Sequence, residues 1–407
     1  MPWPVSSFFV FGRIFGMVRD TGGARDEREP RHRLRASEGG QGCVVISRNQ
    51  PQCMLTAKKA VRMQRGTYVT KVYFRESDYR VEKDLVDTLR KIDPDMSYIV
   101  YPEDFCSVRL ADVQGLCETD ITSTHRNPTS TSRDSDGKRS GSKPLPDMAR
   151  ASVIQRLKEE LMDHFDERKL RARQVDDAYE VMFWVMRSLA KFHENDVAYV
   201  DIKYNNVMST FEGDFRFIDA GFMRRIFDSD AQASYLSLYR YWIIPPSASV
   251  MYYVNRRERR REKSGGARDR VPRGEDLDVP RIMKSYLDNL DYRSRGVVRV
   301  AQSFAGDGFV SHDGLEAFYR RYESTKGEAA RRAILMSTMK ANDVYAAAIM
   351  MLTIVARRFT TANYFALFAN QGMRALIAQC LSHDPAARPT ADQFVKRIRR
   401  VISENTP

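Results

Sequence analysis

Hydrophobic positions in the N-terminal third follow two different periods. Short β-branched and aromatic runs, "CVVIS", "TYVTKVYF" and "SYIVY", lie between residues 43 and 101, and such runs are typical of strands. Before the third run, "DYRVEKDLVDTLRKI" carries Val81, Leu85, Leu89 and Ile92 at helical spacing, which is the pattern of an amphipathic helix. We therefore expect a small sheet that carries one helix.

The pattern changes after residues 118–148, which are dense in Ser, Thr, Asp, Gly and Pro and predict a linker or an exposed insertion. Beyond them, "ASVIQRLKEELMDHF" and "DDAYEVMFWVMRSLAKFH" carry apolar stripes that predict helices. A later run, "VYAAAIMMLTIV" at 344–355, is too short to cross a bilayer and predicts a buried core helix. No transmembrane segment is expected.

Composition limits the function classes. The chain has 407 residues, 43% of them hydrophobic, enough for a core in two domains or one large one. Its 66 Lys and Arg against 53 Asp and Glu give a net charge of +13, which favours acidic partners such as nucleotides, nucleic acid or acidic proteins. The Arg-rich stretch 256–273 predicts a solvated insertion or, as an alternative, a docking surface for such a partner.

Cysteines and the N-terminus bear on localisation. The five cysteines have no metal-ligand spacing and are odd in number, so a reduced, intracellular protein is expected. The first apolar run, "WPVSSFFVFGRIFGMV", lacks a basic leader and a cleavage site, so a secreted protein is not expected.

The polar residues that predict chemistry lie in "YVDIKYNNVM", 199–208, and "FRFIDAGF", 215–222. Asp201, Lys203 and Asn206 follow a predicted helix, and Asp219 comes 219 − 201 = 18 residues after Asp201, beyond a predicted hairpin. This order resembles the eukaryotic-type protein kinases, whose catalytic loop reads H-R-D-L-x-x-x-N and whose metal loop reads D-F-G.

Two further motifs of that family have counterparts upstream. "SEGGQGCV" at 37–44 resembles the glycine-rich loop that covers nucleotide phosphates, and it supplies the candidate ATP-binding residues Gly39, Gly40, Gly42 and Val44. Glycine suits such a loop because the backbone must approach the phosphates without a Cβ in the way. "YVTKV" resembles V-A-I-K and implies Lys71 as the phosphate-binding lysine, and Glu82 on the predicted helix is the best candidate to pair with it.

Two more motifs lie near the C-terminus. "CLSHDPAARPTADQF" resembles the D-P-x-x-R-P-T segment, with Arg388 as its fixed point, and "KANDVYAAAIMML" resembles a buried helix whose Asp343 would bind the catalytic-loop backbone. The resemblance thus covers about 37–395.

The fold implied is α+β and bilobal, with a small antiparallel β-rich N-lobe containing one key helix and a larger, mainly helical C-lobe. The expected divisions are a flexible basic tail at 1–33, the N-lobe at 34–117, the linker at 118–150, the C-lobe at 151–400 with an insertion at about 250–338, and a C-terminal tail at 401–407. The adenine-binding hinge is expected between about 100 and 150.

The resemblance implies an ATP- and Mg²⁺-dependent kinase that phosphorylates Ser or Thr of protein substrates. Asp201 would orient the acceptor hydroxyl, Lys203 would neutralise charge on the transferred group, and Asn206 and Asp219 would bind Mg²⁺. Lys71, oriented by Glu82, would bind the α- and β-phosphates.

Three departures from the family pattern stand out. Tyr199 and Val200 replace His and Arg, so activation through a phosphate bound by that Arg is not expected; Ala220 replaces the Phe of D-F-G. Ser247, after two prolines, replaces the Glu expected to pair with Arg388, so Arg388 should find another carboxylate.

The proline pair, the "GGxGCV" loop and the insertion resemble the divergent Ser/Thr kinases of large DNA viruses. Such a protein would be located in the host cytoplasm or the virion. Two alternatives stay open: a pseudokinase that binds nucleotide or partner proteins without efficient catalysis, and a nucleic-acid binder acting through 256–273.

Overall fold

The computed structural model describes residues 35–39, 42–46, 68–109, 113, 148–165, 173–226, 245–263 and 277–405. The expectations for the tail at 1–33, for Gly40 and for the linker up to residue 147 lie outside these ranges. The chain forms two compact units: unit 1 extends to Leu157 except for residues 97–99, and unit 2 comprises 97–99 and the chain from Lys158 onward. Both α-helices and small antiparallel sheets are present.

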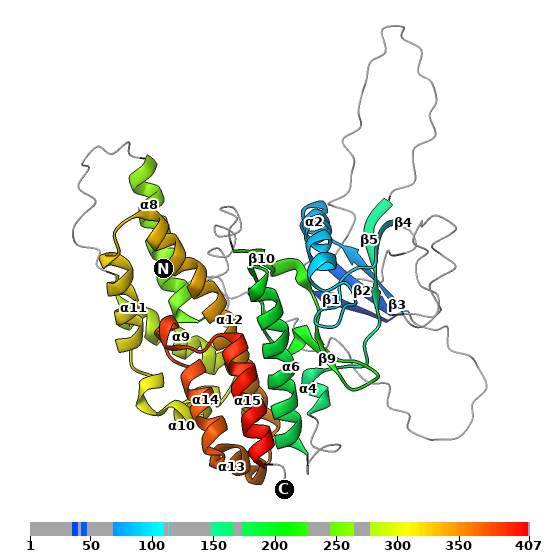
Figure 1. Ribbon diagram of the computed structural model, residues 1–407. Helices are drawn as coiled ribbons and strands as arrows, with labels where there is room; N and C mark the ends of the chain where they lie inside the picture. Colours follow the sequence, from blue (N-terminus) through cyan, green and yellow to red (C-terminus); the bar gives the residue numbers. More distant parts are fainter. Residues whose placement is uncertain are drawn as a thin grey trace. The chain divides into compact units, whose positions relative to one another are not determined.

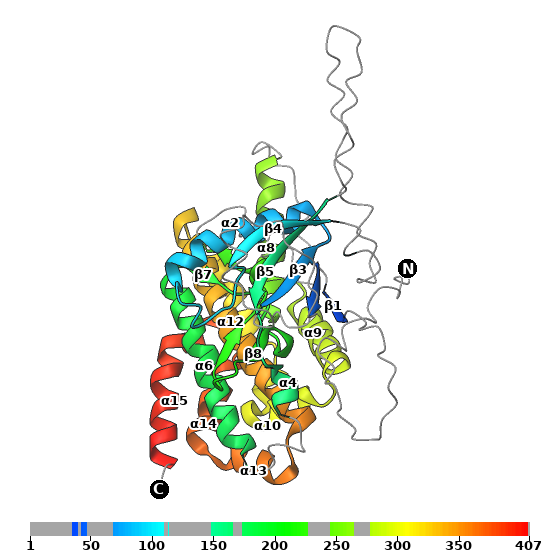
Figure 2. The same cartoon turned by 90° about the vertical axis from the view of Figure 1, so that its right-hand side faces the viewer.

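Unit 1 contains a five-stranded antiparallel sheet in the order β1-β2-β3-β5-β4 (Figure 2). The strands are β1 (Arg35–Gly39), β2 (Gly42–Ile46), β3 (Tyr68–Tyr73), β4 (Asp104–Arg109) and β5 (Met148–Gln155). Gly39 pairs with Gly42 at the end of the first hairpin. A Cβ at Gly42 would lie 2.4 Å from the Val72 carbonyl oxygen of β3, so a side chain there would push the two strands apart.

Helix α2 (Glu76–Ile92) packs against β3 and β5. Its buried positions are Tyr79, Glu82, Leu85, Val86, Leu89 and Ile92. The helix is where the sequence predicts it, but the predicted buried position Val81 is wrong, because its side chain is 44% exposed. The buried side chains lie on the face of α2 that contains Glu82 and Leu89. Val81 is the residue before Glu82, so its side chain points to one side of that face.

Two predicted elements in this part of the chain are wrong. "ASVIQRL" forms most of β5 and not a helix: Ala149, Ala151 and Val153 point into the sheet's core at a period of two. The helical pattern arose because this strand runs into the short helix α4 (Leu161–His164). "SYIVY" forms only an isolated bridge, between Ile99 and Phe217. The chain passes from unit 1 to unit 2 after Leu157.

The cysteines also differ from the expectation of a reduced chain. Cys43 in β2 and Cys106 in β4 are each disulfide-bonded, and both lie in the core of unit 1. Cys380 in unit 2 is a buried free thiol.

Unit 2 has two small antiparallel sheets. One contains β6 (Glu159–Glu160), β8 (Val207–Ser209) and β9 (Phe215–Phe217), and the other contains β7 (Val197–Ala198) and β10 (Arg224–Arg225). The β8–β9 hairpin agrees with the sequence prediction, and Gly213 in its turn has φ +102°, a conformation that glycine adopts readily.

The rest of unit 2 is helical (Figure 1). The longer helices are α6 (Gln174–Glu194), α8 (Pro246–Lys263), α9 (Val279–Arg293), α10 (Val297–Ala305), α11 (Asp313–Ser324), α12 (Glu328–Arg358), α13 (Thr361–Ala369), α14 (Gln371–Cys380) and α15 (Ala391–Asn405). The segment predicted as an insertion is therefore largely helical, and the first part of the Arg-rich stretch continues α8.

Helix α12 is the core helix of unit 2 and contacts α6, α8, α10 and α14. It is much longer than the twelve residues predicted. Among the described helices it is the one long and apolar enough to cross a membrane by length and composition, but 83% of its apolar window is buried inside the protein. That burial is what a core helix requires.

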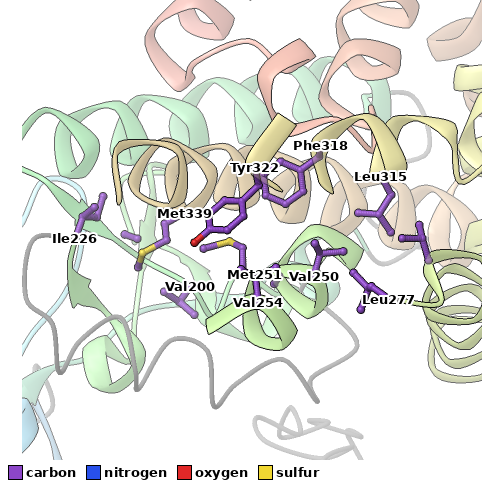
Figure 3. Packing of buried hydrophobic residues seen from close by; sticks show 13 residues of the cluster. Val200, Ile226, Val250, Met251, Val254, Leu277, Leu315, Phe318, Tyr322 and Met339 are labelled. Atoms are coloured by element: carbon purple, nitrogen blue, oxygen red, sulfur yellow. The ribbon is translucent and has the colours of Figure 1, made fainter. Parts of the chain in front are cut away.

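An apolar cluster joins the segment around Val200 to the inserted helices (Figure 3). We call it the Val200 cluster; its buried members are Ala198, Val200, Ile226, Ala248, Val250, Met251, Val254, Leu277, Val279, Leu315, Phe318, Tyr322 and Met339. It draws on α8, α9, α11 and α12, so the insertion packs directly against the segment that contains Asp201.

Candidate functional site

The segment around Asp201 is fixed by one carboxylate of α12. Asp343 Oδ2 accepts hydrogen bonds from the backbone N–H of Tyr199 at 2.8 Å, and Oδ1 accepts from the N–H of Val200 at 2.9 Å. His193, in the last turn of α6, lies 3.0 Å from the same carboxylate through Nε2. Asp343 is 2% exposed, and a buried carboxylate is stabilised by such donors.

Backbone strain is concentrated here. Val200 has φ +75° and Asp219 has φ +60°, and positive φ is a genuine outlier for a β-branched residue. Such conformations persist when the surroundings over-determine them, and they collect at functional sites. At Val200 the determinants are the Asp343 hydrogen bond to its N–H and the burial of its side chain in the Val200 cluster.

Tyr199 links the two predicted motifs. Its hydroxyl donates to the Ile218 carbonyl oxygen and weakly to that of Asp219, at 3.5 Å. Burial, followed by the charges of Asp219 and Asp201, raises the pKa of Tyr199 well above its ordinary value, so the hydroxyl stays protonated and able to donate. Its ring lies 4.1 Å, centroid to centroid, from the ring of Phe217.

The polar residues of the predicted catalytic loop meet in space. Lys203 Nζ lies 2.7 Å from Asp201 Oδ2. Asn206 Nδ2 donates to Asp201 Oδ2 and to the Asp201 carbonyl oxygen, both at 2.8 Å. Asp201 and Asn206 are buried, whereas Lys203 is half-buried. The carboxylate is therefore held in one orientation by an amide and a cation.

Asn206 is also tied to the segment that carries Asp219. Ile218 N–H donates to the Asn206 carbonyl oxygen at 2.9 Å, and Asp219 Oδ1 accepts from Gly221 N–H at 3.3 Å. Because Asn206 Nδ2 faces Asp201, its Oδ1 remains the acceptor atom of that side chain.

The side-chain oxygens of Asp219 and Asn206 could form only part of a Mg²⁺ coordination shell. Asp219 and Asn206 supply oxygen ligands, and Mg²⁺ is commonly bound by one or two such groups together with water and substrate phosphates. Within the described residues, no group of three or more His, Cys, Asp or Glu side chains could bind a metal by itself. Magnesium binding here would thus depend on oxygens from a phosphate ligand.

In unit 1, Lys71 and Glu82 form a buried ion pair with Nζ 2.8 Å from Oε2. Lys71 is in β3 and Glu82 is in α2, so the pair connects the sheet to its helix. Val44 of β2 lies directly across from Lys71 in the sheet register. The structure thus brings together three of the residues that the sequence assigns to phosphate binding.

The sequence predicts a carboxylate partner for Arg388, and its guanidinium donates hydrogen bonds to neutral groups. Its guanidinium donates to the carbonyl oxygens of Ser382 at 2.7 Å and Ala341 at 3.1 Å, to Asn342 Oδ1 at 2.9 Å, and to Ser247 Oγ at 3.3 Å. Ser247 Oγ in turn donates to Asn342 Oδ1 at 2.7 Å. Ser247, the residue at the position of the expected glutamate, is therefore itself a hydrogen-bond partner of Arg388.

The second departure, Ala220, is a buried methyl group, 1% exposed, at the position where the resemblance implies a Phe ring. Phe222 is half-buried and packs against the Val200 cluster.

Glu160 is a residue that the sequence did not reveal. Burial, with a smaller contribution from Asp163, raises its pKa to about 7, although Asn205 Nδ2 donates to its Oε2 at 3.2 Å. Asn205 directly precedes Asn206 in the predicted catalytic loop. Glu160 reaches this place because β6 pairs with β8, and a long-range pairing of two residues leaves no periodic signal in the sequence.

No protein-family model matches the chain, and no curated protein matches it at a significant level.

Proposed function

We propose that the protein is an ATP- and Mg²⁺-dependent kinase that transfers the γ-phosphate to Ser or Thr hydroxyls of proteins. The observation that carries the proposal is the arrangement in which Lys203 and Asn206 both bind the Asp201 carboxylate. Phosphoryl transfer needs little covalent chemistry from the protein, and positioned charges provide most of the rate enhancement.

Each residue has a role in the proposed reaction. Asp201 accepts the hydrogen bond of the acceptor hydroxyl and orients it, and Lys203 stabilises negative charge on the phosphoryl group in transit. Asp219 and Asn206 would bind Mg²⁺, which when bound neutralises phosphate charge. Lys71, oriented by Glu82, binds the α- and β-phosphates, and Gly39, Gly40, Gly42 and Val44 belong to the segment that excludes water from them.

A kinase hinge would then be the connection after β5, at about Gln155–Lys158, because β5 is the strand that leads from unit 1 into unit 2. This is later in the chain than the range of 100–150 expected from the sequence.

The test is Mg²⁺-dependent transfer of labelled γ-phosphate to generic basic and acidic proteins. Asp201→Asn should lower transfer by about 10²–10⁴-fold, the usual contribution of a general base or its equivalent. Asp392→Asn is the control, since Asp392 pairs with Lys396 on the exposed face of α15. Equal incorporation by wild type and Asp201→Asn would reject the proposal.

A second candidate is a pseudokinase, and Ala220 is the observation that favours it. Replacing a buried ring by a methyl group removes packing worth about 3–5 kcal/mol unless neighbours fill the space. This candidate predicts that ATP binds, measured by calorimetry, while labelled phosphate transfer stays at the level of Asp201→Asn. Nucleic-acid binding through 256–273 stays a prediction, since those side chains lie outside the described residues.

A further inference from the structure

A fixed arginine lies beside the catalytic loop. Arg357, in the last turn of α12, donates from Nη1 to the Tyr204 hydroxyl at 3.2 Å, and its guanidinium lies 5.7 Å from the centre of the Tyr204 ring. Tyr204 directly follows Lys203 and begins the 3₁₀ turn that ends at Asn206. Neither contact neutralises the positive charge of Arg357.

The same guanidinium also contacts the inserted segment. Arg357 Nη2 donates to the carbonyl oxygen of Arg293, the last residue of α9, at 2.7 Å. The Arg293 guanidinium lies 5.7 Å from the ring of Tyr292, whose side chain is 74% exposed, and Arg295 follows on the exposed connection to α10. The end of α9 thus adds positive charge beside the catalytic loop.

Among the described residues Arg357 makes no ion pair, and its side chain is exposed. Asp288 and Asp291 are the carboxylates that precede Arg293 in the last turns of α9, and both have other partners. Asp288 binds Lys284 at 2.6 Å, and Asp291 accepts a hydrogen bond from Gly296 N–H at 3.1 Å. An exposed guanidinium of fixed orientation is well suited to bind a carboxylate through two hydrogen bonds.

We propose that Arg357 binds acidic side chains of the substrate protein and so selects Ser or Thr residues in acidic sequences. This inference rests on the proposed kinase function. Tyr204 is three residues from Asp201, a span of at most about 10 Å, and an extended substrate advances about 3.3 Å per residue. With about two further residues allowed for the lengths of the Tyr204 and Arg357 side chains, the acidic residue bound by Arg357 lies within about five positions of the acceptor hydroxyl.

The experiment compares peptides with one Ser acceptor and three Glu, three Gln or three Lys residues at these positions, on either side. The wild-type protein should use the Glu peptide with a kcat/KM about tenfold above the Gln peptide, chiefly through KM, and this ratio should fall with salt. Arg357→Gln should reduce the ratio to about one. Arg320→Gln is the matched control, because Arg320 pairs with Glu316 on the exposed face of α11.

The outcomes separate the inference from the proposed function. Equal use of Glu and Gln peptides by the wild-type protein overturns the inference and leaves the kinase proposal in place. An equal loss of kcat/KM on both peptides in Arg357→Gln has the same consequence, and would mean that Arg357 only caps α9.

If no peptide is phosphorylated, the kinase proposal fails, and the binding of fluorescent Glu and Gln peptides to the wild-type and Arg357→Gln proteins decides whether the subsite exists. Tighter binding of the Glu peptide that Arg357→Gln abolishes supports it, and any other binding result overturns it.

Discussion

The ion pair in unit 1 and the anchored loop in unit 2 stabilise buried charge in different ways. Lys71 and Glu82 are two side-chain charges that meet each other at 2.8 Å. Asp343 instead accepts from two consecutive backbone N–H groups, at Tyr199 and Val200, and lies 3.0 Å from His193 Nε2. A charge pair links two elements at one point, whereas a carboxylate bound to consecutive N–H groups fixes the backbone itself. The second arrangement is the one found where positive φ values must be maintained.

The largest effect is expected from Asp343→Ala. The substitution leaves two buried N–H groups without their acceptor and releases the strained backbone at Val200, so the free energy of unfolding should fall by about 4 kcal/mol. Chemical denaturation measures it. Asp288→Ala, which removes an exposed carboxylate, is the control and should change stability by less than about 1 kcal/mol. A similar small loss in both variants would contradict the anchoring role of Asp343.

Lys71→Met should cost about 3 kcal/mol, because it leaves Glu82 buried without this partner. The double variant Lys71→Met/Glu82→Met should recover much of that loss, since replacing both charges by apolar groups removes their desolvation cost. Denaturant midpoints of the four proteins form a double-mutant cycle. Strict additivity would show that the two charges do not depend on each other, and the contrast with Asp343 would disappear.

Glu160 differs from both groups: among the described residues its carboxyl has no cationic partner, and Asn205 Nδ2 donates to it. Its pKa is about 7 against an ordinary value of 4.5, so the folded protein binds the extra proton between those pH values and loses stability as pH rises through them. Glu160→Gln cannot ionise. It should match wild type at pH 4.5 and be more stable by about 2 kcal/mol at pH 8, after allowance for partial exposure.

Thermal unfolding at several pH values measures this difference. Glu194→Gln is the control, because Glu194 is exposed and pairs with Lys191 at 3.6 Å. A constant difference between Glu160→Gln and wild type across the range would show that Glu160 does not titrate near neutral pH.

Ser247→Ala should have the smallest effect, about 1 kcal/mol. Arg388 keeps its bonds to Asn342, Ala341 and Ser382 when Ser247 Oγ is removed, so a charge shared among several neutral oxygens tolerates the loss of one. Ser337→Ala on the exposed face of α12 is the control for the helix propensity of alanine. A loss above 3 kcal/mol would mean that Ser247 is the main partner of Arg388.

The sequence predicts the parts of the site that depend on local spacing. Asp201, Lys203 and Asn206 lie within six residues, and the hairpin that leads to Asp219 follows at once; the contacts among the first three are therefore short-range. Helix α2 was predictable from its apolar period, and Glu82 from its place on that helix. The sequence did not predict which face of α2 is buried. Val81 and Glu82 are adjacent, and the position of the sheet determines which of the two side chains is buried.

The rest depends on contacts that composition and period do not encode. "ASVIQRL" has apolar residues at both helical and strand spacing, and its pairing with β3 and β4 selects the strand. Glu160 acquires its raised pKa only through burial by a long-range strand pairing. The sequence led to a carboxylate being expected beside Arg388. It does not show that two backbone carbonyl groups, the Asn342 amide and the Ser247 hydroxyl lie around the guanidinium.

The Val200 cluster has a consequence for the order of folding. Val200 is buried by residues of α8, α9, α11 and α12, which lie at least 248 − 200 = 48 positions away along the chain. Contacts between such distant residues form late in folding, because the loss of chain entropy on closing a long loop comes before the stabilisation by the contact. The segment around Asp201 therefore reaches its final conformation only after the inserted helices have assembled, and a nascent chain that ends before α12 lacks the Asp343 carboxylate that binds this segment.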